Sequence, residues 1–566
     1  MQLRTDLEIA QAHQLIPITE IAASVGLAEE DLELYGRYKA KIGLHVLEKF
    51  RERLDGKLID ITAVTPTPLG EGKTLTTIGL TQGLGRIGKR AACTLRQPSM
   101  APVFGIKGGA AGGGYAQVVP MEDLNLHFTG DLHAVAQAHN LLAAMVDASL
   151  FHGNPSRIDP HTVTWPRTLD VNDRVLRNVV VGLGGPLNGY PRQTGFEVTA
   201  ASEVMAVLAL TSGLQDLRRR LGRIMVAFDR DGGPVTAENL RAAGAMAVIL
   251  RDAVKPNLVQ TLEGQPCIVH AGPFGNIAHG QSSVLADRIA LKLVDYVVTE
   301  SGFGADLGMQ KFMDIKCRQS GLRPDCVVVT CTVRALKMHG GVGRIIPGKP
   351  LPEEIRRENV TAVEEGCRNL AHMIRIASYY GVPVVVAVNR FLDDTDAEVE
   401  AILREAVRAG ALSAHQVTAW AEGGAGAVDL AAGVVEACAR GGEFRFLYPD
   451  ELSIKEKIEL MATRIYNADG VSYEPQAEKK ITRFEELGWG RLPICMAKTH
   501  LSISHDPTLK NVPSGYVFPI RDIRASLGAG FLYPLAGTML TMPGLPSEPA
   551  AFNIDLDSQG QVKGLF

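Results

Sequence analysis

Four features that mark large classes of protein are missing from this sequence. No apolar run reaches the roughly 18 residues of a membrane-spanning helix, and the first residues carry acids and lead to no apolar stretch typical of a signal peptide. None of the eight cysteines stands in a Cys-x-x-Cys pair, which indicates scattered reduced thiols. Basic and acidic residues nearly balance, 58 against 62, so bulk charge does not attract nucleic acid or an anionic membrane. We therefore expect a cytoplasmic protein that binds neither nucleic acid nor membrane.

What is present is enough apolar material for a large core. Hydrophobic residues make up 46% of the 566 residues, a length that predicts several domains. From about residue 57 onward, short β-rich runs alternate with helical patterns, which is typical of an α/β fold with a mostly parallel sheet. The clearest of these runs are 57–65, 295–299, 326–330 and 384–388.

The sharpest motif is a glycine loop between a predicted strand and a predicted helix that runs from Leu75 to about Arg86. Such a loop turns backbone N–H groups toward phosphate oxygens, and a following lysine and threonine serve the β/γ-phosphates and Mg²⁺. We assign these roles to Lys73 and Thr74, although the usual P-loop has glycine where this chain has Thr67. The alternative is a glycine-rich turn with an exposed lysine. The loop consists of Thr67, Pro68, Leu69, Gly70, Glu71, Gly72, Lys73 and Thr74.

A Gly-x-Gly-x-x-Gly pattern follows at residues 83–88, but it ends the predicted helix instead of opening one. A dinucleotide-binding fingerprint must follow a strand and begin a helix. We therefore interpret residues 83–88 as a helix end and turn.

A second glycine cluster lies beyond the next predicted strand, 90–95. Arg96 ends that strand and could bind a carboxylate or phosphate through two N–H groups, unless it is an ordinary surface arginine. The glycine-rich residues predict a backbone cradle for an anion, with a flexible linker as the alternative. The cradle residues are Lys107, Gly108, Gly112, Gly113 and Gly114.

At these residues the sequence resembles the formate–tetrahydrofolate ligase family. Residues 105–115 (Gly-Ile-Lys-Gly-Gly-Ala-Ala-Gly-Gly-Gly-Tyr) and 333–341 (Val-Arg-Ala-Leu-Lys-Met-His-Gly-Gly) look like its two most specific motifs. The resemblance runs almost from end to end through segments 121–130, 270–280, 302–308 and 541–546.

The resemblance implies ATP-dependent ligation of formate to tetrahydrofolate. Formate would attack the γ-phosphate of MgATP to give formyl phosphate, whose formyl carbon is then attacked by N10 of tetrahydrofolate. Lys73 and Arg96 are the residues we expect to stabilise this anionic intermediate catalytically. Phe391 and Trp420 would stack on the pterin ring, and Phe303 would lie near the reacting atoms. Taken without the resemblance, Phe391 and Trp420 are each of a kind that is more often a core residue.

The family also implies a homotetramer and activation by a monovalent cation, potassium or ammonium. Its usual glutamate at the cation site is Gln97 here, and Thr538 stands where the family often has an acid. We expect weaker potassium dependence or affinity from Gln97. We draw no ligand contact from Thr538.

Breaks at 345–352 and 440–442 predict three parts. These are a P-loop NTPase-like α/β core with the ATP and formyl phosphate site at 1–345, a middle α/β segment contributing the folate slot at 346–445, and a smaller C-terminal domain at 446–566.

Several alternatives remain open at this point. Glu300 and Asp306 could position Mg²⁺ or water, or form structural ion pairs. His127, His133 and His139 recur every six residues, so they do not share a helix face, and we expect no protein-bound transition metal. The chain could also be a P-loop phosphotransferase or ATPase acting on another small carboxylate, or a non-catalytic relative that binds folate or nucleotide.

Overall fold

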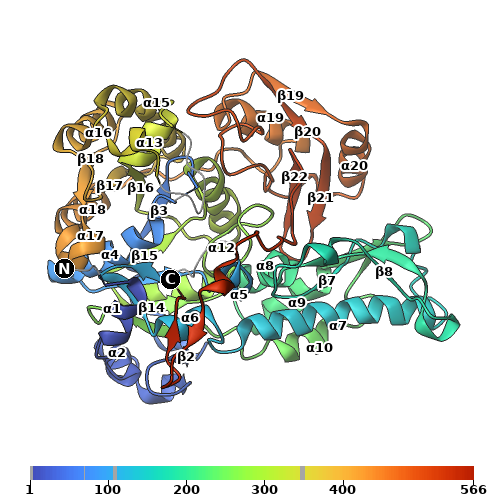
Figure 1. The fold of residues 1–566 in the computed structure, drawn as a ribbon. Coiled ribbons are helices and arrows are strands. Elements are labelled where there is room, and N and C mark those ends of the chain that lie inside the picture. The colour runs from blue at the N-terminus through green and yellow to red at the C-terminus, as the bar shows by residue number, and fades with distance from the viewer. Residues whose placement is uncertain (1–3, 69, 106–110, 344–350, 566) are drawn as a thin grey trace.

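The structure is a computed structural model, and it describes residues 4–68, 70–105, 111–343 and 351–565. Within these residues the predicted alternation of strands and helices builds one 12-stranded sheet (Figure 1). Its strands from β14 through β4, β15, β3, β16 and β17 to β18 are all parallel neighbours. Antiparallel strands complete the edge beyond β14. The predicted α/β class with a mostly parallel sheet is confirmed.

The strand bounds agree closely with the sequence pattern. In sheet order the strands are β1 (Leu32–Leu34), β2 (Ala40–Ile42), β13 (Asn257–Thr261), β14 (Pro266–Val269), β4 (Ala91–Leu95), β15 (Tyr296–Glu300), β3 (Lys57–Ala63), β16 (Cys326–Thr332), β17 (Val384–Asn389) and β18 (Ser413–Val417). The short strands β5 (Gly112–Gly113) and β6 (Ala116–Val119) join through β13. β17 and β18 extend the same sheet as β3 and β16, so the sheet continues across residue 345. The three-part division of the chain stays a prediction.

Helices cover both faces of the sheet because its central strands are apolar on both sides. In β16, Val327 and Val329 belong to one hydrophobic core and Val328 to the other, as the two-residue repeat of a strand requires. One face carries α4 (Lys73–Arg86), η8 (Gly423–Ala427) and α18 (Val428–Arg440). The other carries α13 (Val333–His339), α15 (Val360–Tyr379) and α16 (Asp396–Arg408). The eight cysteines are buried and unbonded.

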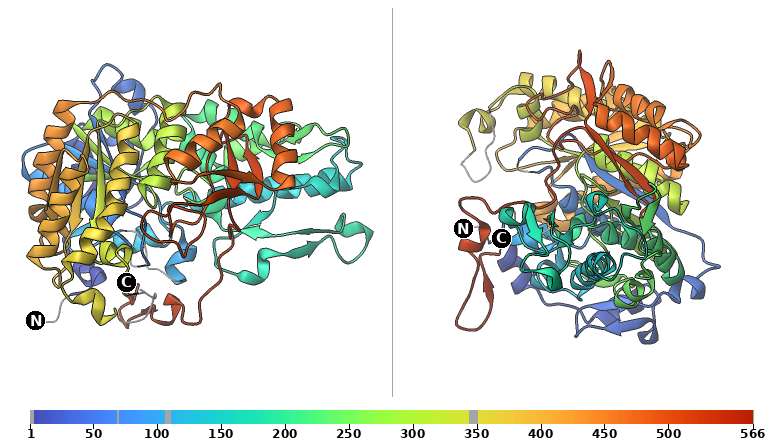
Figure 2. Two further views of the ribbon diagram at one scale, coloured as in Figure 1. Left: turned by 90° about the horizontal axis from the view of Figure 1, so that it is seen from above. Right: turned by 90° about the vertical axis from the view of Figure 1, so that its right-hand side faces the viewer.

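Two further units extend from this body (Figures 1 and 2). An arm contains α7 (Asp131–Phe151), α8 (Glu203–Leu210), α9 (Leu214–Arg223) and α10 (Ala243–Ile249), with β7 (Arg167–Thr168), β8 (Val179–Val181), β9 (Arg192–Thr194), β10 (Phe196–Glu197), β11 (Met225–Phe228) and β12 (Pro234–Thr236). A C-terminal unit contains α19 (Ile454–Arg464), α20 (Pro475–Glu486), β19 (Gly470–Tyr473), β20 (Val517–Ile520), β21 (Asp522–Ser526) and β22 (Phe531–Leu535). Across the described ranges we find no helix both long and apolar enough to span a bilayer.

The remaining elements are a hairpin near the end of the chain and short helices spread along it. The last hairpin, β23 (Asp555–Leu556) with β24 (Val562–Lys563), lies beside the N-terminal region, where Gln11 donates a hydrogen bond to the carbonyl of Val562. The short helices are α1 (Asp6–Ala12), α2 (Ile18–Ser24), α3 (Val46–Lys49), α5 (Met100–Phe104), α6 (Met121–Asn125), α11 (Val284–Leu293), α12 (Arg318–Ser320), α14 (Glu353–Arg356) and α17 (Ala419–Glu422).

Candidate active site

The glycine loop connects the central strand β3 to α4. Gly70 and Gly72 have φ angles of 76° and 73°, a left-handed conformation that glycine adopts without strain. A Cβ atom on Gly72 would lie 2.7 Å from Nδ2 of Asn389. The same Nδ2 donates to the carbonyl of Glu71 at 2.8 Å, and Oδ1 of Asn389 accepts from Thr76 at 3.1 Å. Asn389, which ends β17, therefore holds the loop against the sheet.

Sequence reasoning gave Asn389 no role in this loop. Its only signal was a polar residue at the end of an apolar strand. Of the predicted loop residues, Leu69 lies outside the described residues.

Helix α4 begins two residues earlier than the pattern predicted, at Lys73 instead of Leu75, and it ends at Arg86 as expected. Lys73 and Thr74 therefore occupy the first turn, where unpaired N–H groups give the helix start a positive potential. Gly88 follows the helix with a φ of 76°, which confirms residues 83–88 as a helix end.

A buried glutamate joins the helix start to the neighbouring strands. Oγ1 of Thr74 donates a hydrogen bond of 2.7 Å to Oε2 of Glu300, which is 3% exposed. The guanidinium of Arg96 lies 3.7 Å from Oε1 of the same carboxylate. This arrangement follows from the sheet, because β15, which ends at Glu300, lies between β3 and β4. The structure thus brings Thr74, Arg96 and Glu300 together.

Asp306, the other acid left open by the sequence, forms a buried ion pair instead. Its carboxylate lies 2.6 Å from Nζ of Lys498, and both side chains are almost completely buried. This is the structural alternative that the sequence analysis considered for both acids.

Three buried groups in the loops that follow β4 and β14 have no hydrogen-bond partner within the described part of the chain. They are Nε of Arg96, Oε1 of Gln97 and both ring nitrogens of His279. Burial, and then the positive charges of Lys316, Lys311 and Arg96, hold the pKa of His279 well below its usual value. A neutral imidazole, a guanidinium N–H and an amide carbonyl are thus buried here without a partner among the described residues. Sequence reasoning did not single out His279, although it lies in the quoted segment 270–280.

The second glycine cluster contacts Trp420. Lys107 and Gly108 lie outside the described residues. A Cβ atom on Gly114, whose φ is 55°, would lie 1.9 Å from the carbonyl oxygen of Trp420, and Tyr115 N donates to the same oxygen at 2.8 Å. The N–H of Gly114 donates to Oδ1 of Asp6 at 2.7 Å. Because that N–H already has a protein partner, it is not free to bind an anion. The contribution of Gly114 is instead to allow the close approach to Trp420.

Gly112 and Gly113 form β5, which pairs with β6. The nearest side-chain ring to Gly113 is also that of Trp420, whose Cδ1 would lie 3.4 Å from a Cβ atom on this glycine.

Phe303 and Phe391 lie in loops, and Trp420 lies in the short helix α17. Phe391 follows β17 and Trp420 follows β18, the adjacent parallel strand, so both stand beyond the same edge of the sheet. Phe391 is 40% exposed, and the guanidinium of Arg334 lies 3.9 Å from its ring centroid. A phenylalanine in the hydrophobic core would be far less exposed. Trp420 is half-buried.

Phe303 has a φ of 63° and stacks on His500 with ring centroids 4.5 Å apart. Burial lowers the pKa of His500 to about 4, with further contributions from the charges of Lys498 and Lys73. His500 is therefore neutral at pH 7, and it is a second histidine that the sequence analysis missed.

A cavity of about 890 Å³ lies between the arm and the C-terminal unit. Its lining includes Ala278, which precedes His279 in the chain, and Thr538, one of the positions at which the chain departs from the family pattern. Burial raises the pKa values of two lining carboxyls, Glu197 and Glu203, to about 8 each. Both are therefore largely protonated at pH 7.

The geometry around Thr74 indicates the class of protein. It is an α/β protein whose glycine loop and helix start are suited to binding a phosphate group. Residues 4–566 match the family model described as formate–tetrahydrofolate ligase, and the chain belongs to that family. It is accordingly an enzyme, an ATP-dependent ligase of formate and tetrahydrofolate.

Curated relatives of the same description match along their full length. A formate–tetrahydrofolate ligase of Desulforamulus reducens is 70% identical over 99% of both chains. One of Roseiflexus castenholzii is 60% identical and one of Saccharopolyspora erythraea 56% identical, each over 100% of both chains.

Proposed function

We propose that this enzyme makes 10-formyltetrahydrofolate in two steps. A formate oxygen attacks the γ-phosphorus of ATP, the bond to ADP breaks, and formyl phosphate forms. N10 of tetrahydrofolate then attacks the formyl carbon, inorganic phosphate leaves, and N10 loses a proton. The observation that carries the proposal is the convergence of Thr74, Glu300 and Arg96 at the start of α4.

Lys73 and Arg96 supply the cations for the anionic groups of this pathway. Lys73 opens the helix next to the loop, and its charge contributes to the lowered pKa of His500. Arg96 brings a guanidinium whose Nε has no partner among the described residues. A carboxylate or phosphate oxygen would satisfy that donor. The glycine loop, with its departure at Thr67, acts as a P-loop variant in this scheme.

The residues also fit the metal ions that the reaction requires. The hydroxyl of Thr74 and the carboxylate of Glu300 are oxygen ligands of the kind that Mg²⁺ prefers, and they would hold the ion that accompanies ATP. Oε1 of Gln97, a buried carbonyl oxygen without a described partner, would contribute to a monovalent cation site. An amide carries no net charge, so potassium binds more weakly here than beside a glutamate.

Phe391 and Trp420 form the folate slot in this proposal. Their positions after two adjacent strands, and the exposed face of Phe391, support a flat apolar site for the pterin. Phe303 stacks on His500, whose pKa is lowered in part by the charge of Lys73, and in this proposal it would lie near the reacting formyl group.

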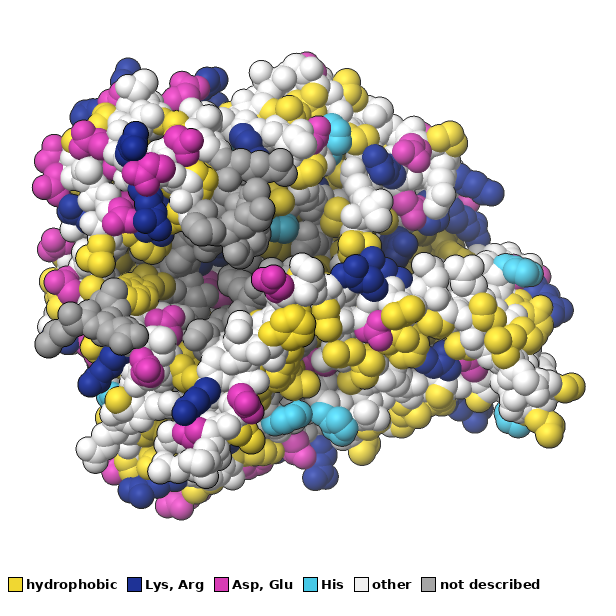
Figure 3. Space-filling model, in the orientation of Figure 1, with side chains coloured by type: hydrophobic (Ala, Val, Ile, Leu, Met, Phe, Trp, Pro, Cys, Tyr) yellow, Lys and Arg dark blue, Asp and Glu magenta, His cyan; other side chains and the backbone are white. Residues whose placement is uncertain are grey.

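We also propose a homotetramer in the cytoplasm. The arm exposes apolar side chains around β8 and β9, as the hydrophobic surface at the right of Figure 3 shows. Val175, Leu183 and Leu187 are 77%, 64% and 89% exposed, which favours burial against another copy of the chain. Eight buried, unbonded cysteines suit a reducing compartment.

The test is ADP release from MgATP, with formate and tetrahydrofolate each omitted in turn. Release that requires both substrates and matches 10-formyltetrahydrofolate supports the proposal. Release with formate alone would indicate an uncoupled acyl phosphate step. ADP release with another small carboxylate in place of formate would favour the phosphotransferase alternative, and nucleotide binding without release would favour a non-catalytic relative.

A further inference from the structure

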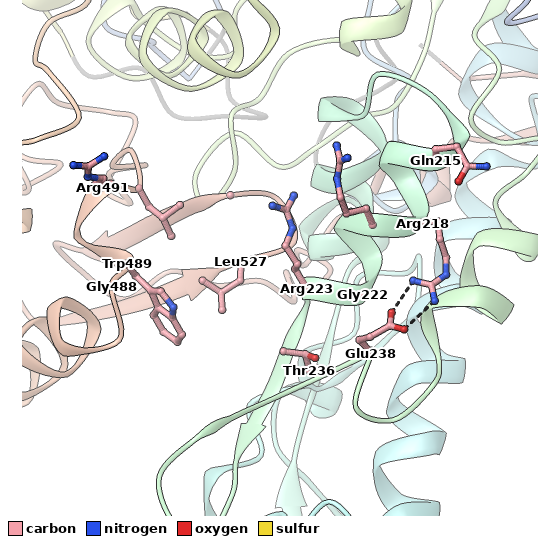
Figure 4. Close-up of a pocket in the computed structure, with 13 residues that line it drawn as sticks. Gln215, Arg218, Gly222, Arg223, Thr236, Glu238, Gly488, Trp489, Arg491 and Leu527 are labelled. Carbon is pink, nitrogen blue, oxygen red and sulfur yellow. Dashed lines mark hydrogen bonds and ion pairs between the residues drawn. The ribbon is translucent and has the colours of Figure 1, made fainter.

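A second cavity, of about 860 Å³, lies between α9 and the C-terminal unit (Figure 4). In this view Arg223 and Arg218 extend from α9, while Trp489 and Leu527 come from the C-terminal unit. None of these residues belongs to the site described above. The volume falls within the range of small-molecule sites.

The lining is strongly basic. Four arginines contribute to it, whereas Glu238 is the one acidic residue in the described lining. Glu238 is already bonded to Arg218 through two hydrogen bonds of 2.6 and 3.0 Å. The nearby Asp216 is shared between Arg219, at 2.6 Å, and Arg220, at 2.8 Å. The local carboxylates are therefore engaged.

The side chains of Arg223 and Arg491 form neither an ion pair nor a hydrogen bond with any residue that the structure describes. Desolvation, followed by the positive charge of Arg220, lowers the pKa of Arg223. Glu203 is the other acid whose charge acts on Arg223, but burial raises its pKa to about 8, so it is mostly neutral at pH 7. An incoming anion would relieve this uncompensated positive charge.

The remaining wall is aromatic and apolar. Trp489 is half-buried and packs against Phe484 with ring centroids 5.0 Å apart, and Leu492 and Leu527 adjoin it in the lining. An indole beside guanidinium groups is suited to a flat ligand that carries negative charge.

We propose that this cavity is a second ligand site, which takes an organic anion with at least two carboxylate or phosphate groups and an aromatic or apolar part. Arg223 and Arg491 bind the anionic groups, and Trp489 packs against the apolar part. Two sources share this chemistry, namely the glutamate end of the folate substrate and a separate small anion.

The first experiment titrates benzenehexacarboxylate into the full enzyme by calorimetry, with MgADP present to occupy the nucleotide site. We expect one site per chain whose affinity falls as salt rises. The double variant Arg223→Gln/Arg491→Gln should weaken binding at least tenfold. The control Arg251→Gln/Arg408→Gln removes two charges from side chains 71% and 80% exposed and should change it less than twofold.

The second experiment separates the two sources. A KM for tetrahydrofolate pentaglutamate that rises about tenfold in the double variant, with the monoglutamate KM unchanged, assigns the cavity to the substrate's own tail. Unchanged KM values together with lost benzenehexacarboxylate binding assign it to a separate anion. Absence of binding to the parent enzyme, or equal binding to the double variant, overturns the proposal. If the double variant does not fold, Arg491→Gln alone provides the comparison. The calorimetry needs no turnover, so its outcome is independent of the proposed reaction.

Discussion

The hydroxyl of Thr74 donates a hydrogen bond to the carboxylate of Glu300 across a separation of 226 residues in the chain. The contact exists because β15 and β3 are parallel neighbours, with Glu300 opposite Ile61 in the register. Both strands deliver their carboxyl ends to the start of α4. The pair places a hydroxyl and a carboxylate at the start of the helix, next to Lys73.

Removal of the Thr74 hydroxyl should lower the catalytic efficiency with MgATP. We expect Thr74→Ala to lower kcat/KM for MgATP about 100-fold, the usual order for the loss of one well-placed group in a transition state. Thr74→Ser keeps the hydroxyl and should retain most of the activity. A coupled ADP assay measures both, and equal activity of the two variants would contradict the role of Thr74.

Lys73→Ala should abolish phosphoryl transfer while the protein stays folded. The lysine is in the first turn of α4, and its charge has no substitute on that turn. We expect turnover to fall by about three orders of magnitude. Lys89→Ala, which changes a lysine beyond the other end of the helix, is the matched control. Retained turnover in Lys73→Ala would remove the basis for the phosphate-loop assignment.

Gln97→Glu should strengthen activation by potassium. The buried Oε1 of Gln97 has no partner among the described residues, and a carboxylate there would add a negative charge beside the cation. We expect the half-activating potassium concentration to fall about tenfold, or about 1.4 kcal/mol. Activation curves for the parent and the variant provide the measurement. Identical activation curves for the parent and the variant would indicate that the cation binds elsewhere. A parent curve that matches the curve of a glutamate-bearing relative would indicate the same.

The substitutions Gly114→Ala and Gly88→Ala distinguish the cost of a strained backbone angle from the cost of a steric clash. Both glycines have positive φ angles, but a Cβ atom on Gly88 meets nothing within 4 Å, whereas one on Gly114 meets the Trp420 carbonyl at 1.9 Å. Gly88→Ala should therefore cost about 1 kcal/mol of unfolding free energy. Gly114→Ala should cost about 2–4 kcal/mol and should raise the KM for tetrahydrofolate by displacing Trp420. Chemical denaturation and steady-state kinetics test both. A normal KM in a destabilised Gly114→Ala would argue against Trp420 in the folate slot.

Glu203 should make the protein less stable at high pH. Burial raises its pKa to about 8 from an ordinary value of 4.5. Between these pH values the folded protein keeps a proton that the unfolded chain releases, so the free energy of unfolding falls as pH rises through this window. Glu203→Gln keeps the carbonyl acceptor for the N–H of Gly528, which donates at 2.7 Å in the parent.

At pH 9 we expect Glu203→Gln to be more stable than the parent by about 1–3 kcal/mol, with a smaller difference at pH 5. Chemical denaturation at both pH values measures the difference in unfolding free energy, and Glu400→Gln, at an exposed position, is the control. Equal pH slopes in the parent and in Glu203→Gln would contradict the prediction.

Local sequence determined the elements that depend on neighbouring residues. The run Val384–Asn389 is a strand because continuous β-branched and small apolar residues suit a sheet buried on both faces. The glycine loop before Lys73 and the helix end at Gly88 were predictable because positive φ angles require a residue without a side chain. The resemblance of long motifs then gave the family, which the match over residues 4–566 confirms.

Only the tertiary structure decided which distant groups meet. Asn389 supports the loop before α4, Asp6 occupies the N–H of Gly114, and Glu300 reaches Thr74. None of these contacts follows from spacing along the chain, because strand order and register bring the residues together and neither is written in a local pattern. For the same reason the two acids that looked equivalent in the sequence differ in the fold. Glu300 lies at the helix start, while Asp306 is neutralised by Lys498 in the interior.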